Sequence, residues 1–118
     1  MNARRHERLG WGMVCVFGAL GLVLETLHGL KWGPYLDPPH ATRRLLWTLA
    51  HAHGVLLGLV NLAFAAWARS GAGWQGRMAD VASGCLVGAS WLTPAGFFLG
   101  GAWLWGNDPN PMVLASPL

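Results

Sequence analysis

Charged residues are scarce in this chain of 118 residues: Asp, Glu, Lys and Arg together make up 11%. That is roughly half the share found in a typical soluble domain. Hydrophobic residues make up 53%. A globule of this composition lacks the polar surface needed to cover it in water. The composition therefore argues against a soluble fold and predicts lipid as the surroundings.

The chain also lacks the motifs of common soluble enzymes and redox proteins. It has no Walker motif or other phosphate-binding glycine loop, no Cys-x-x-Cys pair and no recognisable Ser-His-Asp order. The two cysteines, Cys15 and Cys85, lie in apolar segments, where cysteine usually packs as a small hydrophobic side chain. These absences give no sign of catalysis, although they leave enzymatic activity open.

Nucleic-acid binding is not expected either. The net charge of +3 comes mainly from arginines at the ends of apolar segments, not from a continuous basic and aromatic stripe. Cations at the ends of apolar helices contact lipid headgroups instead. The expected partners are the lipid bilayer and other membrane segments.

Three apolar segments are long enough to cross a membrane as helices: 9–30, 45–68 and 81–105. At about 1.5 Å per residue, each crosses a hydrocarbon core of about 30 Å. Turn-rich links containing Pro and Gly separate them. The sequence thus predicts an all-α, antiparallel helical bundle that forms a single membrane domain over residues 1–118. The tail 106–118 is too short to span the membrane by itself. It is either an interfacial tail or the start of a fourth helix.

The N-terminal apolar segment is longer than the core of a signal peptide, which has about 7 to 15 residues, so we expect it to stay as a helix. Basic residues near the helix ends predict its orientation, because they are in excess on the cytoplasmic side. Five lie on the side of the N-terminus and three on the other, which predicts a cytoplasmic N-terminus. The two sets are Arg4, Arg5, Arg8, Arg69 and Arg77 against Lys31, Arg43 and Arg44.

Small residues form a stripe on each of the last two predicted helices. Such stripes let helices approach closely in lipid, where van der Waals packing replaces the hydrophobic effect. We expect both stripes to be packing faces, and we expect the chain to form a homo-oligomer or to dock with other membrane subunits. The stripes are Ala50, Gly54, Gly58, Asn61 and Ala65 in one helix, and Gly84, Gly88, Trp91 and Ala95 in the other.

Ionisable residues interrupt the apolar pattern at one level of the bundle. Glu25 and His28 are three residues apart, so they share one face of the first helix. The second helix runs back from the same side and brings His51 and His53 to the same depth. Ionisable side chains inside a membrane span usually mark a binding site or a proton path. The sequence therefore predicts cofactor binding by His28, His51 and His53, with all three and Glu25 as candidate metal ligands.

The two histidines of the pair His51 and His53 project about 200° apart around a helix, so they cannot both face one metal ion. His51 lies nearer the small-residue stripe, and His53 would address another helix, another cofactor or another subunit. A purely structural interpretation is also open, in which these imidazoles reach interfacial water or a backbone carbonyl and Glu25 hydrogen-bonds to one of them.

The string Ala50-His51-Ala52-His53-Gly54 resembles the His-x-His helix of haem-copper oxidase subunit I, where two histidines serve opposite faces. This resemblance covers five residues and implies axial haem or copper ligation by His51 and His53. The strings Leu-Glu-Thr-Leu-His-Gly and Arg-Arg-Leu-Leu-Trp-Thr-Leu-Ala-His-Ala-His-Gly resemble an uncharacterised group of small bacterial membrane proteins. That resemblance implies the bacterial inner membrane.

Three classes of function follow from these patterns. The first is a non-catalytic accessory or scaffold subunit of a membrane complex, and the sequence favours it. The alternative is a membrane protein that uses the histidine cluster to bind haem, a chlorophyll-type pigment or copper. The third is a small transporter or proton channel, for which the cytoplasmic half supplies few polar groups: Asn61, Ser83 and the two cysteines.

Overall fold

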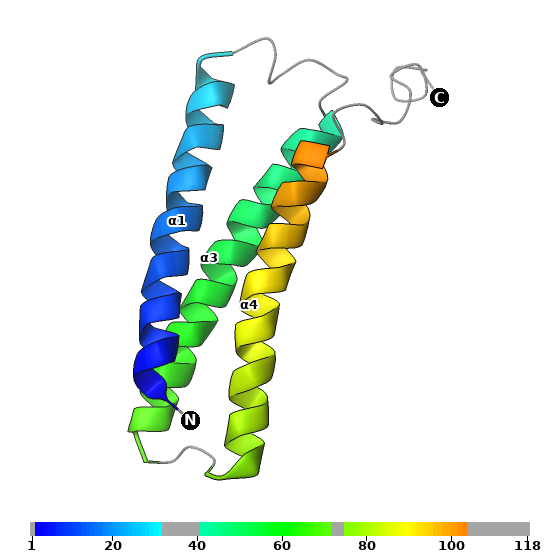
Figure 1. Ribbon diagram of the computed structural model, residues 1–118. Coiled ribbons are helices and arrows are strands. Elements are labelled where there is room, and N and C mark those ends of the chain that lie inside the picture. Colours follow the sequence, from blue (N-terminus) through cyan, green and yellow to red (C-terminus); the bar gives the residue numbers. More distant parts are fainter. Residues whose placement is uncertain (1, 32–40, 72–74, 104–118) are drawn as a thin grey trace, which may run out of the picture.

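The computed structural model describes residues 2–31, 41–71 and 75–103, and within these ranges it is helical without strands. The three helices are α1 (Ala3–Gly29), α3 (Ala41–Arg69) and α4 (Arg77–Trp103). Each is long and apolar enough to cross a membrane. They form the predicted antiparallel bundle, with each helix running opposite to the one before it (Figure 1). The predicted tail 106–118 lies outside the described residues.

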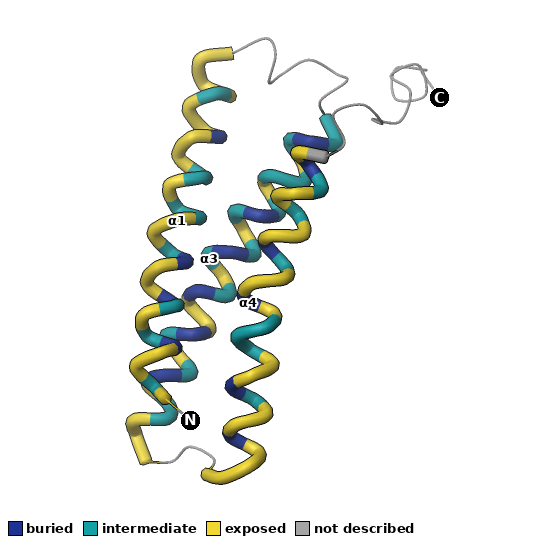
Figure 2. Tube along the Cα trace, viewed as in Figure 1, coloured by how far each residue is buried: buried dark blue, intermediate teal, exposed yellow. Residues whose placement is uncertain are grey.

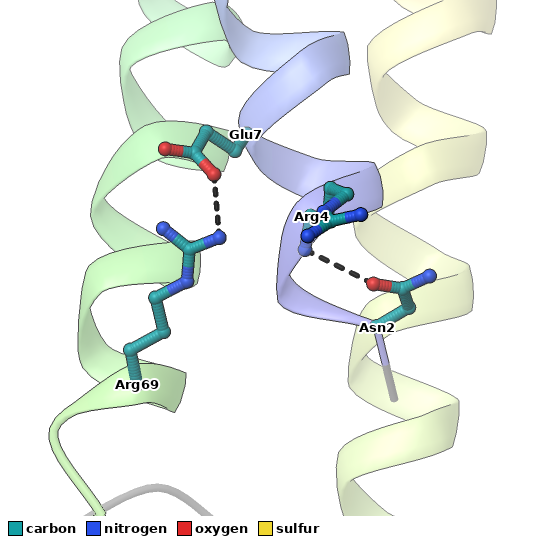
Figure 3. A network of polar contacts seen from close by, with 4 residues as sticks. All are labelled: Asn2, Arg4, Glu7 and Arg69. Carbon is teal, nitrogen blue, oxygen red and sulfur yellow. Dashed lines mark hydrogen bonds and ion pairs between the residues drawn. The ribbon is translucent and has the colours of Figure 1, made fainter.

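Each helix begins before the apolar segment that predicted it. Most of the added residues are polar or charged. Those at the start of α1 stay helical because this helix is capped and joined to α3. The side chain of Asn2 accepts a hydrogen bond from the backbone N–H of Arg4 at 3.1 Å, as an N-cap residue does. Glu7 pairs with Arg69 at the end of α3 at 2.6 Å (Figure 3). Helix starts lie at Ala3, Ala41 and Arg77, in place of residues 9, 45 and 81.

The central helix of the bundle is α3, which packs against both α1 and α4. In Figure 1 it runs obliquely, close to α1 near the N-terminus and close to the end of α4 at the opposite end of the bundle. Burial is correspondingly concentrated along α3 (Figure 2). The stripe predicted for this helix is confirmed, because all five of its residues are buried: Ala50, Gly54, Gly58, Asn61 and Ala65.

Glycines bring the backbones of α1 and α3 into direct contact. A Cβ built on Gly58 would lie 2.9 Å from the carbonyl oxygen of Gly10, and one built on Gly10 would lie 2.8 Å from that of Gly58. One turn away, a Cβ on Gly54 would overlap the ring of Phe17. In lipid, close approach of this kind contributes attraction between helices through van der Waals packing.

The stripe predicted for α4 is not its buried face. Gly84 and Ala95 are exposed, and Trp91, expected to pack against a neighbour, is 65% exposed. The buried face is displaced by about one residue, or about 100° around the helix. Polar groups accompany the displacement: the hydroxyl oxygens of Ser83 and Ser90 accept hydrogen bonds from Arg5 of α1 and Asn61 of α3, whereas glycine carries no polar side chain that needs a partner. Buried residues of α4 are Ala79, Ser83, Ser90, Pro94 and Gly101.

Candidate functional site

A buried polar network joins all three helices near the end of the bundle where α1 begins. His6 of α1 and Asn61 of α3 are both 0% exposed, and Ser83 and Ser90 of α4 are 1% and 2% exposed. Buried polar groups are almost always hydrogen-bonded, because an unsatisfied one carries its full desolvation penalty. The partners of these four side chains can therefore be followed atom by atom.

The amide of Asn61 has a fixed orientation. Its Nδ2 donates to the carbonyl oxygen of Leu57 at 2.8 Å and to Oγ of Ser90 at 2.7 Å. A carbonyl oxygen can only accept, so the atom facing Leu57 must be the amide nitrogen. Ser90 in turn donates its hydroxyl proton to the carbonyl oxygen of Leu86 at 2.7 Å. Both amide hydrogens are thus used, and Oδ1 of Asn61 is left to face His6.

This orientation assigns the tautomer of His6. Nδ1 of the imidazole lies 2.7 Å from Oδ1 of Asn61, which only accepts, so Nδ1 carries the proton. In the neutral ring Nε2 is then an acceptor, and it lies 2.6 Å from Oγ of Ser83. The Ser83 hydroxyl donates to Nε2 and accepts from Nη2 of Arg5 at 2.7 Å. Phe64 of α3 contacts the edge of the imidazole, with ring centroids 4.7 Å apart.

The sequence did not single out His6 as a site residue. It lies in the basic stretch before the predicted span, where a histidine is expected to face water or lipid headgroups. Only two of its partners were named from the sequence. Asn61 was the polar member of the α3 stripe, and Ser83 was one of few polar groups in its half of the bundle. Because α1 begins at Ala3, His6 is part of the helix and lies inside the bundle.

The predicted cluster of ionisable residues is partly assembled. Glu25, His28 and His51 line one cavity of about 300 Å³ between α1 and α3, near the end of α1. Glu25 and His28 are exposed, whereas His51 is half-buried. The remaining lining residues of this cavity are Gly21, Leu24 and Thr48.

His51 is held against α1 in a defined tautomer. Its Nδ1 donates to the carbonyl oxygen of Phe17 at 2.6 Å, so in the neutral ring Nε2 keeps its lone pair. The ring lies against Gly21, where any Cβ would overlap it. A carbonyl that accepts from Nδ1 is the usual outer partner of a histidine whose Nε2 binds a metal or haem iron.

His53 lies apart from this cavity. Its Nδ1 donates to the carbonyl oxygen of Leu49 in its own helix at 2.9 Å, and its ring lies 5.0 Å from that of Phe97 in α4. The two histidines therefore serve opposite faces of α3, as their spacing predicted. The four predicted ligands are not brought together, and the described residues contain no group of three or more His, Cys, Asp or Glu side chains that could hold a metal ion.

The two polar regions lie toward opposite ends of the bundle. Along α3, His51 and Asn61 are ten residues apart, which corresponds to about 15 Å. This separation does not favour a continuous polar path for a transported ion or solute.

The fold and these two regions define a class of protein: a bundle of three candidate membrane-spanning helices, locked by a buried polar network at one end and carrying a histidine-lined cavity toward the other. Comparison of the chain with protein-family models, curated proteins and solved structures found no match.

Proposed function

We propose that the chain is a small multi-pass membrane protein of the bacterial inner membrane and serves as an accessory or scaffold subunit. In this role it forms homo-oligomers or docks onto other membrane subunits. The observation that carries the proposal is the glycine-rich surface of α4, defined here as Gly84, Gly88 and Gly96.

A Cβ at any of these three glycines would meet nothing within 4 Å, in contrast to Gly10, Gly54 and Gly58 at the contact between α1 and α3. Glycine is an unfavourable helix residue, by about 1 kcal/mol relative to alanine. A glycine that faces lipid has no packing contact that offsets this cost, whereas a glycine that faces another helix permits close approach of the two backbones. The α4 glycine surface therefore suits a second helix from outside the described bundle.

Gly88→Leu is expected to weaken association at least about tenfold, because a branched side chain holds the partner helix away from the α4 backbone. The measurement is the oligomeric state and the co-purifying subunits of the full chain, by light scattering and mass spectrometry in mild detergent. Ala52→Leu provides a matched control, since it adds a similar volume at an exposed position of α3. Equal association of both variants and the parent chain would contradict the proposal.

We further propose that the N-terminus is cytoplasmic. The start of α1, the end of α3 and the start of α4 lie at the same end of the bundle in Figure 1. Five arginines belong to these parts of the helices: Arg4, Arg5, Arg8, Arg69 and Arg77. Basic residues near helix ends are retained on the cytoplasmic side. The test is the variant Asn2→Cys, treated in intact cells with a thiol reagent that cannot cross the membrane. Labelling of this cysteine would contradict the orientation.

A second candidate function is cofactor binding in the cavity lined by Glu25, His28 and His51. The hydrogen bond from His51 to the Phe17 carbonyl favours it, because this bond fixes the tautomer that a ligating histidine needs. His28 and Glu25 line the same cavity, and in this proposal they would serve as a further ligand and as an orienting carboxylate. A bound haem, magnesium-containing pigment or copper ion would supply the electron-transfer or light-absorbing chemistry.

If this second function holds, the protein purified in mild detergent has a Soret band, a pigment band or stoichiometric metal, and His51→Ala loses it. His53→Ala provides the control, because His53 does not line the cavity and is expected to leave the signal unchanged. Absorption spectra and metal analysis of the three proteins check the expectation. A colourless, metal-free parent protein would contradict it.

A further inference from the structure

We propose that Ser83 is an activated nucleophile, with His6 as its general base and Asn61 as the residue that positions the base. The proposal goes beyond the scaffold role and does not rest on it. Oγ of Ser83 lies 2.6 Å from Nε2 of His6, and Nδ1 of His6 lies 2.7 Å from Oδ1 of Asn61. A nucleophile within hydrogen-bond reach of a base, which a third group orients, is the arrangement that acyl-transfer sites share on unrelated folds.

The orientation of Asn61 removes the usual objection to an amide in this position. In a serine protease, replacing the buried aspartate by asparagine lowers turnover about 10⁴-fold, because the amide stabilises the wrong histidine tautomer. Here both amide hydrogens are engaged by Leu57 and Ser90, so Asn61 presents its oxygen to Nδ1. His6 therefore keeps a lone pair on Nε2, where a base must have it.

Ser83 is buried but lines a recess. Together with Arg5, Asn2, Asp80 and Gly84 it borders a surface recess of about 560 Å³ at the end of the bundle. The hydroxyl oxygen has two lone pairs, and the hydrogen bond from Arg5 uses one of them, which leaves the second for attack. The guanidinium of Arg5, 2.7 Å from Oγ, is also placed to donate to an oxyanion that forms beside the new bond.

The depth of the site indicates its substrate. With 27 residues α1 is about 40 Å long, so about 5 Å extends beyond each side of a hydrocarbon core of about 30 Å when the helix is centred. His6 is the fourth residue of α1 and lies about 4.5 Å from its start, at the boundary between headgroups and acyl chains. The carboxylic esters of membrane lipids lie at this depth.

An apolar groove on the same side of the bundle suits the acyl chain of such an ester. Two cavities between α1 and α4, of about 350 and 490 Å³, share Val16, Phe17 and Ala95 and so form one continuous groove. The groove begins at Arg8 and Ser90, about two helical turns from Ser83, and continues along both helices toward the opposite end of the bundle. We therefore assign the substrate class as a long-chain carboxylic ester.

The reaction has two balanced steps. In the first, Oγ of Ser83 forms a bond to the ester carbonyl carbon while its proton passes to Nε2 of His6. The carbon–oxygen bond to the alcohol then breaks, and the departing alcohol takes the proton from Nε2. In the second, water attacks the acyl-Ser83 ester with His6 again accepting the proton, which releases the carboxylic acid and restores the Ser83 hydroxyl.

The experiment is covalent labelling of the full chain, in mild detergent, with an alkyl fluorophosphonate that carries a fluorescent tag. Phosphonylation of Ser83 releases fluoride, and peptide mass spectrometry locates the adduct. We expect one adduct, on Ser83, which Ser83→Ala abolishes. His6→Ala should slow labelling by about 10² to 10⁴-fold, the usual contribution of a general base. Ser70→Ala alters an exposed serine at the end of α3 and should leave the rate unchanged.

Variants of Asn61 separate positioning from folding. Asn61→Ala should slow labelling, whereas Asn61→Asp retains an oxygen acceptor for Nδ1 and should restore the rate. Ser83→Cys provides a second readout that leaves the network in place: its thiol should react with iodoacetamide faster than Cys15 and Cys85 of the same chain, and His6→Ala should remove the difference. An unlabelled parent chain, an adduct on another serine, or labelling that is insensitive to His6 would overturn the proposal.

Discussion

Asn61→Ala is expected to lower the free energy of unfolding by about 2 to 4 kcal/mol. The side chain is fully buried, and it connects α3 to His6 of α1 and to Ser90 of α4. Its removal leaves Nδ1–H of His6 without an acceptor, and an unsatisfied buried donor costs about 1 to 3 kcal/mol. A single hydrogen bond between membrane helices averages about 0.6 kcal/mol, because the unfolded chain in lipid finds other partners. Two such bonds and one stranded donor therefore set the expected range.

The measurement is reversible unfolding in mixed micelles of mild detergent and sodium dodecyl sulfate. Thr26→Ala is the control, because its hydroxyl is exposed and donates only to the carbonyl of Leu22 in the same helix at 2.8 Å. A double-mutant cycle adds a stricter test. His6→Ala and Asn61→Ala should be less destabilising together than the sum of their separate effects, since either one already breaks the bond between them. Additive effects would contradict a direct interaction.

The positions of the helices follow from the sequence because the bilayer imposes one length on every apolar segment that crosses it. Over the described residues, the three predicted segments lie within the observed helices except at the end of α1, where the prediction runs one residue past Gly29; the predicted residues 104 and 105 lie outside the part of the chain that the structure describes. Hydropathy alone could not predict the residues added at the start of each helix, because most of them are polar or charged. At the start of α1 these residues are helical because of a cap, an ion pair and buried hydrogen bonds.

The burial of α3 was predictable, whereas the rotation of α4 was not. On α3 one stripe holds Asn61 together with small residues, so packing and polar satisfaction select the same face. On α4 they compete: the glycines mark one face, while Ser83 and Ser90 mark another about 100° away. The structure buries the serines, where their hydroxyl oxygens accept hydrogen bonds from Arg5 and Asn61 of the neighbouring helices, and leaves the glycine face outside.

The two sets of site residues show the same division. Sequence spacing correctly placed His51 and His53 on opposite faces of α3, since helix geometry alone decides that. It could not predict the bond between His6 and Asn61, which joins residues 55 positions apart and depends on how two helices cross. A contact between residues so far apart in the sequence is found only when the packing of the helices is known.

Gly58→Ile is expected to be the most disruptive single substitution at the contact between α1 and α3. Its Cβ would lie 2.9 Å from the backbone oxygen of Gly10, and a backbone cannot move aside as a side chain can. Overpacking of a well-packed interior costs about 1 to 3 kcal/mol, and separating two helices also forfeits their contacts along the interface. We therefore expect a loss of about 3 kcal/mol or more in the unfolding assay.

Gly18→Ile is the matched control on α1. A Cβ there meets nothing within 4 Å, and replacing glycine in a helix improves helix propensity by about 0.5 kcal/mol, so this variant should be neutral or slightly more stable. Gly58 precedes Asn61 by less than one turn, so moving α1 away should also separate His6 from Asn61. Nitrogen-15 resonances of the His6 ring should shift in Gly58→Ile and stay unchanged in Gly18→Ile. Equal stability and equal imidazole resonances in the two variants would show that the α1–α3 contact tolerates a side chain, and that the His6 network does not depend on the close approach of Gly10 and Gly58.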